Sequence, residues 1–226
     1  MEFVKTKDSA KGIKVVSARL TKELKRNKRV LWLVCGGSGI AAEAQVLKAL
    51  QKNGNTENLA IMLMDERFGP VSHADSNWQQ LLDAGCDFTG MYAMPVMTKP
   101  EKPLRQTVAD YAKLTKVAID AADVIIGQFG VGADGHTAGM LPNSPAVQKT
   151  TAQVVGYESS PFVRITLTRQ ALKKVDVAYV FAFGAAKRGA LKDLQANKKS
   201  FERLPSKIFW DLPEAYVYND QLGDTK

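Results

Sequence analysis

The sequence predicts an α/β domain of three layers, in which helices cover both faces of a mainly parallel β-sheet. Three observations favour this architecture. Short apolar runs alternate with helical patterns from residue 30 onward, the runs end in glycine-rich or charged turns, and no repeat or linker divides the chain. A length of 226 residues suits one hydrophobic core, so we expect a single domain over residues 1–226.

The N-terminal segment carries most of the net positive charge. Residues 1–30 hold ten Lys and Arg against three Asp and Glu, whereas residues 31–226 hold 21 against 20. Apolar side chains recur here at the spacing of a helix over residues 11–26: Ile13, Val16, Leu20 and Leu24. The basic residues then form the solvated face of this helix. Because no interleaved aromatic residues or DNA- or RNA-binding motif accompany them, we expect no specific nucleic-acid partner.

The next segments predict two strands, each followed by a turn and a helix. The apolar run 30–35 is typical of a buried strand, the glycines of 36–39 turn the chain, and a helical pattern then extends to a stop at Asn53-Gly54. Residues 59–64 predict a second buried strand that ends in a charged triplet. After a polar loop, residues 78–84 predict a short helix.

The second half of the chain repeats this alternation. The predicted elements are a helix over 101–122, a strand over 124–129, a strand over 163–167, a short helix capped by Thr168, a strand over 177–183 and a helix ending near 196. In parallel sheets, ligands bind beyond the carboxyl ends of the strands. Those ends supply four polar segments: 36–39, 65–67, 130–136 and 184–187. We therefore expect the site at this edge.

Two glycine patterns resemble a dinucleotide fingerprint. In the second, Gly130-x-Gly132-x-x-Gly135, Pro142 follows too soon for a long helix. The first, Gly37-x-Gly39-x-x-Ala42, precedes a helix, but free backbone amides at a helix N-terminus bind a single phosphate equally well. We favour phosphate over a purely structural turn, and an NAD-linked dehydrogenase is the weakest alternative.

His136 is the most suggestive chemical group, because it lies on a glycine loop at a strand end, two residues after Asp134. Imidazole has a pKa suited to a general base near neutral pH, and a carboxylate can fix its tautomer. His73 shows no such context, and we expect it to be structural or exposed. Two distant histidines and no cysteine cluster make a metal site unexpected.

Other polar residues leave their roles open. Arg164 and Lys187 are candidates to bind an anion, although each alone is more often a solvated charge. The triplet 65–67 is an acid/base group, a sugar-binding group or a strand-terminal ion cluster. The apolar runs are too short to cross a membrane. The charged N-terminus and two cysteines without CxxC spacing predict a cytoplasmic protein with reduced thiols.

Five segments in order resemble the motif series of the 6-phosphogluconolactonase family. They are Cys35-Gly36-Gly37-Ser38, Met64-Asp65-Glu66-Arg67 with Ser76-Asn77, residues 130–142, Arg164-Ile165-Thr166-Leu167-Thr168, and Gly184-Ala185-Ala186-Lys187. The resemblance covers residues 30 to 190 and extends to glucosamine-6-phosphate deaminase and, more remotely, ribose-5-phosphate isomerase. It implies a Rossmann-like sheet that handles phosphorylated sugars without an organic cofactor. We expect a monomer or a homodimer.

The resemblance also implies a reaction and a role for each residue. The reaction is hydrolysis of 6-phospho-D-glucono-1,5-lactone in the oxidative pentose phosphate pathway. His136 would activate water, Asp134 would orient it, and Asp65 would face the sugar ring. The phosphate would be held by Ser38, the amides of Gly36 and Gly37, Arg67, Arg164 and Lys187.

The sequence departs from the family pattern at two positions. Gly39 stands where a Thr is usual, and Gly139 stands where a Ser is usual. Leu141 occupies the position at which the deaminase carries a catalytic Glu, so a deaminase-like isomerase is the weaker alternative. A sugar-phosphate sensor without catalysis is another, but residues 1–30 are too short for an attached DNA-binding module.

Overall fold

The computed structural model describes residues 1–53 and 56–223 and contains two sheets. All neighbouring strands of the main seven-stranded sheet are parallel, in the order β1-β10-β9-β6-β2-β3-β5. Its strands are β1 (Glu2–Lys5), β2 (Val30–Val34), β3 (Leu59–Leu63), β5 (Tyr92–Met94), β6 (Val124–Gly130), β9 (Val177–Ala182) and β10 (Glu214–Asn219). The predicted mainly parallel sheet is confirmed.

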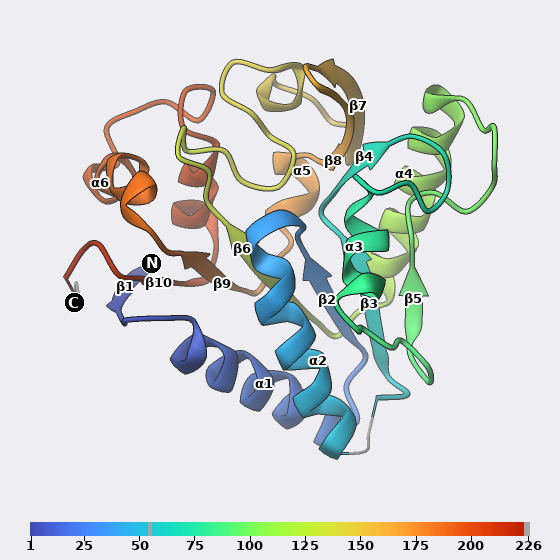
Figure 1. Cartoon of the computed structure of the whole chain (residues 1–226), viewed down its shortest axis with the longest axis horizontal. Coiled ribbons are helices and arrows are strands. Elements are labelled where there is room, and N and C mark those ends of the chain that lie inside the picture. Colours follow the sequence, from blue (N-terminus) through green and yellow to red (C-terminus); the bar gives the residue numbers. More distant parts are fainter. Residues whose placement is uncertain (54–55, 224–226) are drawn as a thin grey trace.

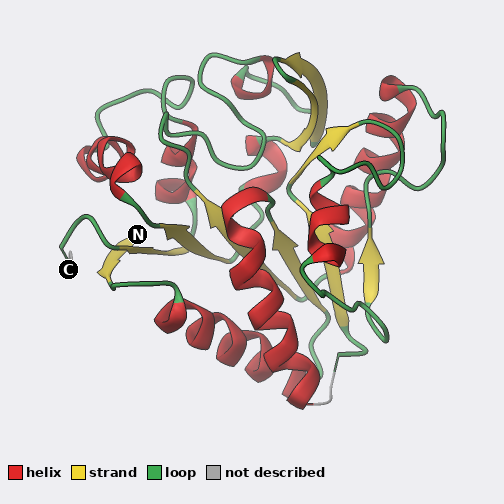
Figure 2. Ribbon diagram, in the orientation of Figure 1, coloured by secondary structure: helices red, strands yellow, loops and turns green. Residues whose placement is uncertain are grey.

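Helices cover both faces of the main sheet (Figure 1). They are α1 (Ala10–Lys25), α2 (Ile40–Asn53), α3 (Asn77–Asp83), α4 (Leu104–Ala121), α5 (Arg169–Leu172) and α6 (Arg188–Ala196). Figure 2 shows α1 and α2 together in front of the sheet, while α4 lies behind it. The three-layer arrangement is the predicted one. No helix among the described residues is long and apolar enough to cross a membrane.

A small antiparallel sheet lies beside the main one, and the sequence did not predict it. It consists of β4 (Asp65–Phe68), β8 (Phe162–Leu167) and β7 (Val154–Ser159) in that order. The predicted strand over 163–167 exists, but it pairs with β4 and β7 and not with the main sheet. The charged triplet at 65–67, expected at a strand end, is itself extended. This pairing places Arg67 opposite Arg164.

The core lies between the main sheet and its helices. Every residue of β2 and β9 is buried, as expected for strands covered on both faces. The four apolar residues predicted for the first helix are buried in α1: Ile13, Val16, Leu20 and Leu24. The predicted and observed helices differ at their ends by up to three residues, and Pro103 before α4 explains one such difference. Gly54, the predicted stop of α2, lies outside the described residues.

Candidate functional site

A polar cavity of about 210 Å³ opens at the carboxyl ends of β2, β6 and β9. The small sheet contributes residues of β4 and β8. All the predicted site residues except Asp134 line this cavity: Gly36, Gly37, Ser38, Asp65, Arg67, His136, Arg164 and Lys187. Cys35, Asn77, Gly130, Val131, Gly132 and Ala138 complete the lining. The parallel strands and the small antiparallel sheet together bring these segments into one place, although they are far apart in the sequence.

The glycine turn after β2 forms one wall of the cavity. The backbone at Gly37 has a φ of +60°, which favours glycine, and the short 3₁₀ turn Gly37–Gly39 leads directly into α2. A Cβ atom on Gly36 would lie 1.9 Å from Oδ1 of Asn77, so only glycine allows this close approach. The first amides of α2 and its turn lack helical partners and suit an anion.

The loop after β6 holds His136 in a defined orientation. One carboxylate oxygen of Asp134 lies 2.6 Å from Nδ1 of His136 and accepts a hydrogen bond from the His136 backbone amide at 3.1 Å. A Cβ on Gly132 would lie 2.0 Å from Nδ1. Gly135 has a φ of +87° and thereby turns the loop. Glycines at these two positions therefore let the imidazole and carboxylate pack against the backbone.

The charge state of Asp134 follows from this contact. Partial burial acts to raise its pKa, but the hydrogen bonds from the amide and imidazole of His136 lower the pKa overall. The carboxylate is therefore ionised near neutral pH. If Nδ1 carries the imidazole proton and donates a hydrogen bond to Asp134, Nε2 is unprotonated and has a free lone pair.

Asp65 provides a second carboxylate, buried in the cavity wall. Asn77 donates from Nδ2 to the Asp65 backbone carbonyl at 2.9 Å and approaches its Oδ2 at 3.4 Å. Burial raises the pKa of Asp65, while Arg67, Arg164 and His136 act to lower it. Asp65 thus lies within electrostatic reach of the imidazole and of two guanidinium groups.

The neighbouring Glu66 has a structural role. It is fully buried, and its carboxylate accepts hydrogen bonds from the backbone amides of Arg67, Asn77 and Trp78 and from the hydroxyl of Ser76. These contacts cap the N-terminus of α3, where amides lack helical partners. Because successive side chains of β4 point to opposite faces, Asp65 lines the cavity while Glu66 stabilises the start of α3.

Three cationic side chains line the cavity. Arg67 and Arg164 lie at 5.2 and 5.5 Å from the ring centroid of Phe162. Nη1 of Arg164 lies 3.9 Å from Oδ2 of Asp65, and Nε of Arg67 is buried with no hydrogen-bond partner among the described residues. Lys187, on the turn after β9, has no ion pair within the same part of the chain. The cavity therefore offers positive charge that Asp65 only partly balances.

Sequence reasoning gave no role to Asn77, Glu43 or His73. Asn77 appeared only as part of a motif, yet it lines the cavity and contacts both Asp65 and Gly36. Glu43 is buried behind the glycine turn, and its carboxylate accepts a hydrogen bond from the backbone amide of Cys35. His73, expected to be structural or exposed, is partly buried, and its Nε2 lies 2.8 Å from the carbonyl oxygen of Arg67.

The two departures from the family pattern have steric explanations. A Cβ at position 39 would lie 2.5 Å from Sγ of Cys35. A Cβ at position 139 would lie 2.8 Å from Cβ of Thr166 and 3.1 Å from Cβ of Asp65. Glycine at both positions therefore permits close packing at the cavity wall.

In the described part of the chain, no group of three or more His, Cys, Asp or Glu side chains is placed to hold a metal ion.

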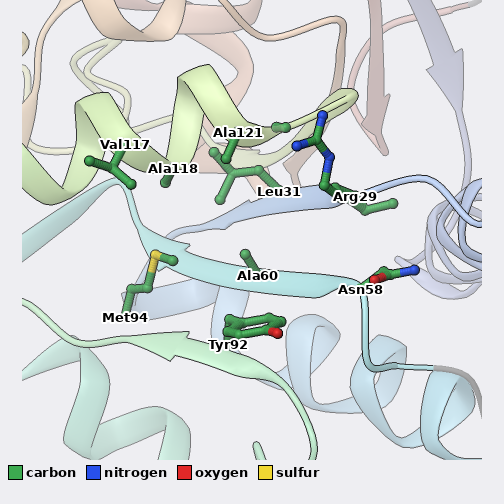
Figure 3. Close-up of a pocket in the computed structure, with 11 residues that line it drawn as sticks. Arg29, Leu31, Asn58, Ala60, Tyr92, Met94, Val117, Ala118 and Ala121 are labelled. Carbon is green, nitrogen blue, oxygen red and sulfur yellow. The ribbon is translucent and has the colours of Figure 1, made fainter.

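A second cavity of about 250 Å³ lies at the opposite ends of the strands. Figure 3 shows its lining from β2, β3, β5 and α4. The lining is mainly apolar and includes Leu31, Ala60, Met94 and Ala118, with Tyr92 and Arg29 at its edges. The guanidinium of Arg29 pairs with Asp123 at 2.6 Å. None of the predicted site residues lines this cavity.

Comparisons with known proteins give the family of the chain and agree with its fold. The sequence profile of a family described as glucosamine-6-phosphate isomerases/6-phosphogluconolactonase matches residues 6–217. The chain is 29% identical over 200 residues to the 6-phosphogluconolactonase of Bos taurus, which covers 80% of this chain and 76% of that protein.

Solved structures show the same architecture. The 6-phosphogluconolactonase of Thermotoga maritima superposes with a TM-score of 0.77 at 15% identity, over 96% of this chain and 97% of that chain. A monomeric glucosamine-6-phosphate deaminase superposes with a TM-score of 0.75 at 18% identity, over 97% of both chains. At these identities the superpositions establish the fold and do not separate the two activities.

Proposed function

Because the chain belongs to the glucosamine-6-phosphate isomerase/6-phosphogluconolactonase family, we propose that it hydrolyses 6-phospho-D-glucono-1,5-lactone to 6-phospho-D-gluconate. This would be the second step of the oxidative pentose phosphate pathway. One observation carries the proposal: His136, whose Nδ1 contacts Asp134, and three cationic side chains line one polar cavity at the carboxyl ends of the strands. The activity named for the Bos taurus relative supports the same assignment.

The phosphate of the substrate would bind at the glycine turn. The amides near Gly36 and Gly37, the hydroxyl of Ser38 and the cations Arg67, Arg164 and Lys187 line one cavity. Backbone amides at a helix start and guanidinium groups both favour phosphate. A phosphate held far from the reacting carbon positions the lactone, so that its binding energy lowers the entropic cost of reaction.

His136 would act as the general base. With Nδ1–H donated to Asp134, Nε2 takes a proton from water as the water oxygen attacks C1 of the lactone. The tetrahedral oxyanion then collapses, the bond from C1 to the ring oxygen breaks, and the imidazolium returns the proton to that oxygen. Asp134 orients the imidazole of His136 and stabilises its protonated form. Asp65 faces the sugar ring of the substrate.

The deaminase-like alternative is supported by the superposition at a TM-score of 0.75. The resemblance implies that the deaminase uses a catalytic proton relay, which a Glu five residues after the motif histidine completes. In this chain the position holds Leu141, whose side chain cannot carry a proton. We therefore favour lactone hydrolysis.

Acid release measured in a pH-stat tests the proposal, with the lactone generated in situ and spontaneous opening subtracted. We expect rapid hydrolysis of the phosphorylated lactone and no release of ammonia from glucosamine 6-phosphate. No acceleration by micromolar protein would contradict the proposed reaction. Ammonia release would favour the deaminase-like alternative.

A further inference from the structure

A buried carboxyl group lies directly behind the glycine turn. Glu43, in the first turn of α2, has an exposed fraction of 1%. Its Oε1 accepts a hydrogen bond from the backbone amide of Cys35 at 2.7 Å, and Cys35 itself lines the cavity. Its Oε2 is buried and has no hydrogen-bond partner in residues 1–53 and 56–223. A buried carboxylate with one unpaired oxygen is costly.

The position of Gly39 links this carboxyl to the turn. A Cβ at Gly39 would lie 2.5 Å from Sγ of Cys35 and 3.5 Å from Oε1 of Glu43. The backbone of the turn therefore faces the thiol and the carboxyl at close range. Where the family pattern has a hydroxyl able to donate to phosphate, this chain has a glycine with an acidic group behind it.

The titratable groups around Glu43 would all be neutral or negative. They come from the end of β2 (Cys35), from β4 (Asp65) and from the segment after α3 (Cys86). Burial raises the pKa of Glu43 to about 8, the amide and the thiol of Cys35 act to lower it, and Asp65 raises it further. Burial also raises the pKa of Cys35 well above its ordinary value. No cation among the described residues pairs with Glu43.

We propose that Glu43 is a positioning residue for the phosphate and must be neutral for the turn to hold a dianion, so that binding draws a proton onto its carboxyl. The inference rests on the proposed binding of phosphate at the turn. Like charges repel strongly where protein excludes water. By linkage, a ligand that disfavours ionised Glu43 raises its pKa, and ionisation of Glu43 weakens binding of the ligand by the same factor.

This coupling predicts how affinity depends on pH. A phosphate monoester has its second pKa near 6, so the ligand is a dianion throughout the range above about pH 7. Affinity should then be constant up to roughly pH 8 and fall above it, by up to about tenfold per pH unit. This decrease in affinity would come from ionisation of a protein group, because the ligand does not change its charge in this pH range.

Isothermal titration calorimetry of the whole chain with 6-phosphogluconate tests the inference. Titrations between about pH 7 and pH 9, in pairs of buffers with different ionisation enthalpies, measure protons taken up on binding. We expect uptake that rises toward one proton near pH 8 to 9. This measurement needs no variant. Binding without proton uptake across this range would overturn the inference.

Two variants assign the proton. Glu43→Gln keeps an oxygen that can accept from the Cys35 amide but cannot ionise, so we expect uptake to vanish and affinity to stay constant with pH. Cys86→Ala, near Glu43 but outside the cavity lining, serves as the comparison and should retain the uptake. Uptake that persists in Glu43→Gln would assign the proton to another group and overturn the role of Glu43.

The outcomes separate this inference from the proposed function. Normal binding and lactone hydrolysis without proton uptake would leave the function in place and remove the role of Glu43. Failure of 6-phosphogluconate to bind at any pH would overturn the inference, whereas failure of lactone hydrolysis would contradict the proposed function. Lactone hydrolysis at about pH 7 is measured separately for this purpose.

Discussion

The two cavities at opposite ends of the main sheet differ in chemistry although they are similar in size. The polar cavity measures about 210 Å³ and the apolar cavity about 250 Å³. Both involve β2, one beyond its carboxyl end at Gly36 and the other at its amino end near Leu31. β2 thus contributes to both cavities, but loops that follow β2, β6 and β9 help to line the polar cavity, whereas β2, β3, β5 and α4 line the apolar one.

Charge is also handled differently at the two ends. In the apolar cavity the guanidinium of Arg29 is paired with Asp123 at 2.6 Å. In the polar cavity Nη1 of Arg164 lies 3.9 Å from Asp65, and Lys187 has no ion pair in the described part of the chain. Cationic groups left without close partners indicate a site prepared for an anion. Size alone therefore does not distinguish a functional cavity from a packing gap.

The largest expected effect comes from removing His136, the proposed base in the polar cavity. We expect His136→Ala to lower kcat for the phosphorylated lactone by on the order of 10²–10⁴, with a smaller change in KM, because general-base catalysis contributes about this much. Steady-state kinetics in the pH-stat measure both constants. A change of less than about threefold would assign His136 a structural role.

Removing a cation should have different effects at the two ends. We expect Lys187→Met to raise KM for the phosphorylated lactone roughly 10- to 100-fold, the usual range for a charge-assisted contact. The slow hydrolysis of unphosphorylated gluconolactone should hardly change. Arg29→Met is the matched control and should leave both substrates unaffected. Equal loss on both substrates would point to misfolding and contradict the phosphate contact.

Filling the apolar cavity should have the smallest effect. Ala118 is buried in α4 and faces this cavity. We expect Ala118→Leu to raise the free energy of unfolding by about 1 kcal/mol, since it buries additional methylene groups. Urea unfolding measures the change, and lactone kinetics should stay constant. A changed KM would show that the two ends are coupled.

Much of the site could be predicted because parallel strands place the loops after them at one edge. Gly36, Asp65, His136 and Lys187 lie together for this reason. Local pattern was less informative about short edge strands, because β1 has four residues and β5 has three. It also failed for the small antiparallel sheet, whose pairing joins Arg67 to Arg164 across almost a hundred residues.

Glu43 could not be identified from the sequence for a different reason. A glutamate in the first turn of a helix is usually a solvated residue that favours the helix dipole. Only the tertiary approach of the β2 end, with the amide of Cys35 at 2.7 Å, buries it. Asn77 was similarly hidden, because its contact with Gly36 depends on how α3 packs beside the glycine turn. The spacing of residues along the chain does not indicate such tertiary contacts.

The pairing of β1 with β10 has a consequence for biosynthesis. Glu2 lies opposite Tyr216, so one edge strand waits for its hydrogen-bonding partner until the ribosome has made nearly the whole described chain. The cavity residues, from Cys35 to Lys187, are all translated before β10. Their segments can therefore meet while the amino-terminal strand is still unpaired. During translation, completion of the sheet follows the appearance of the segments that line its site.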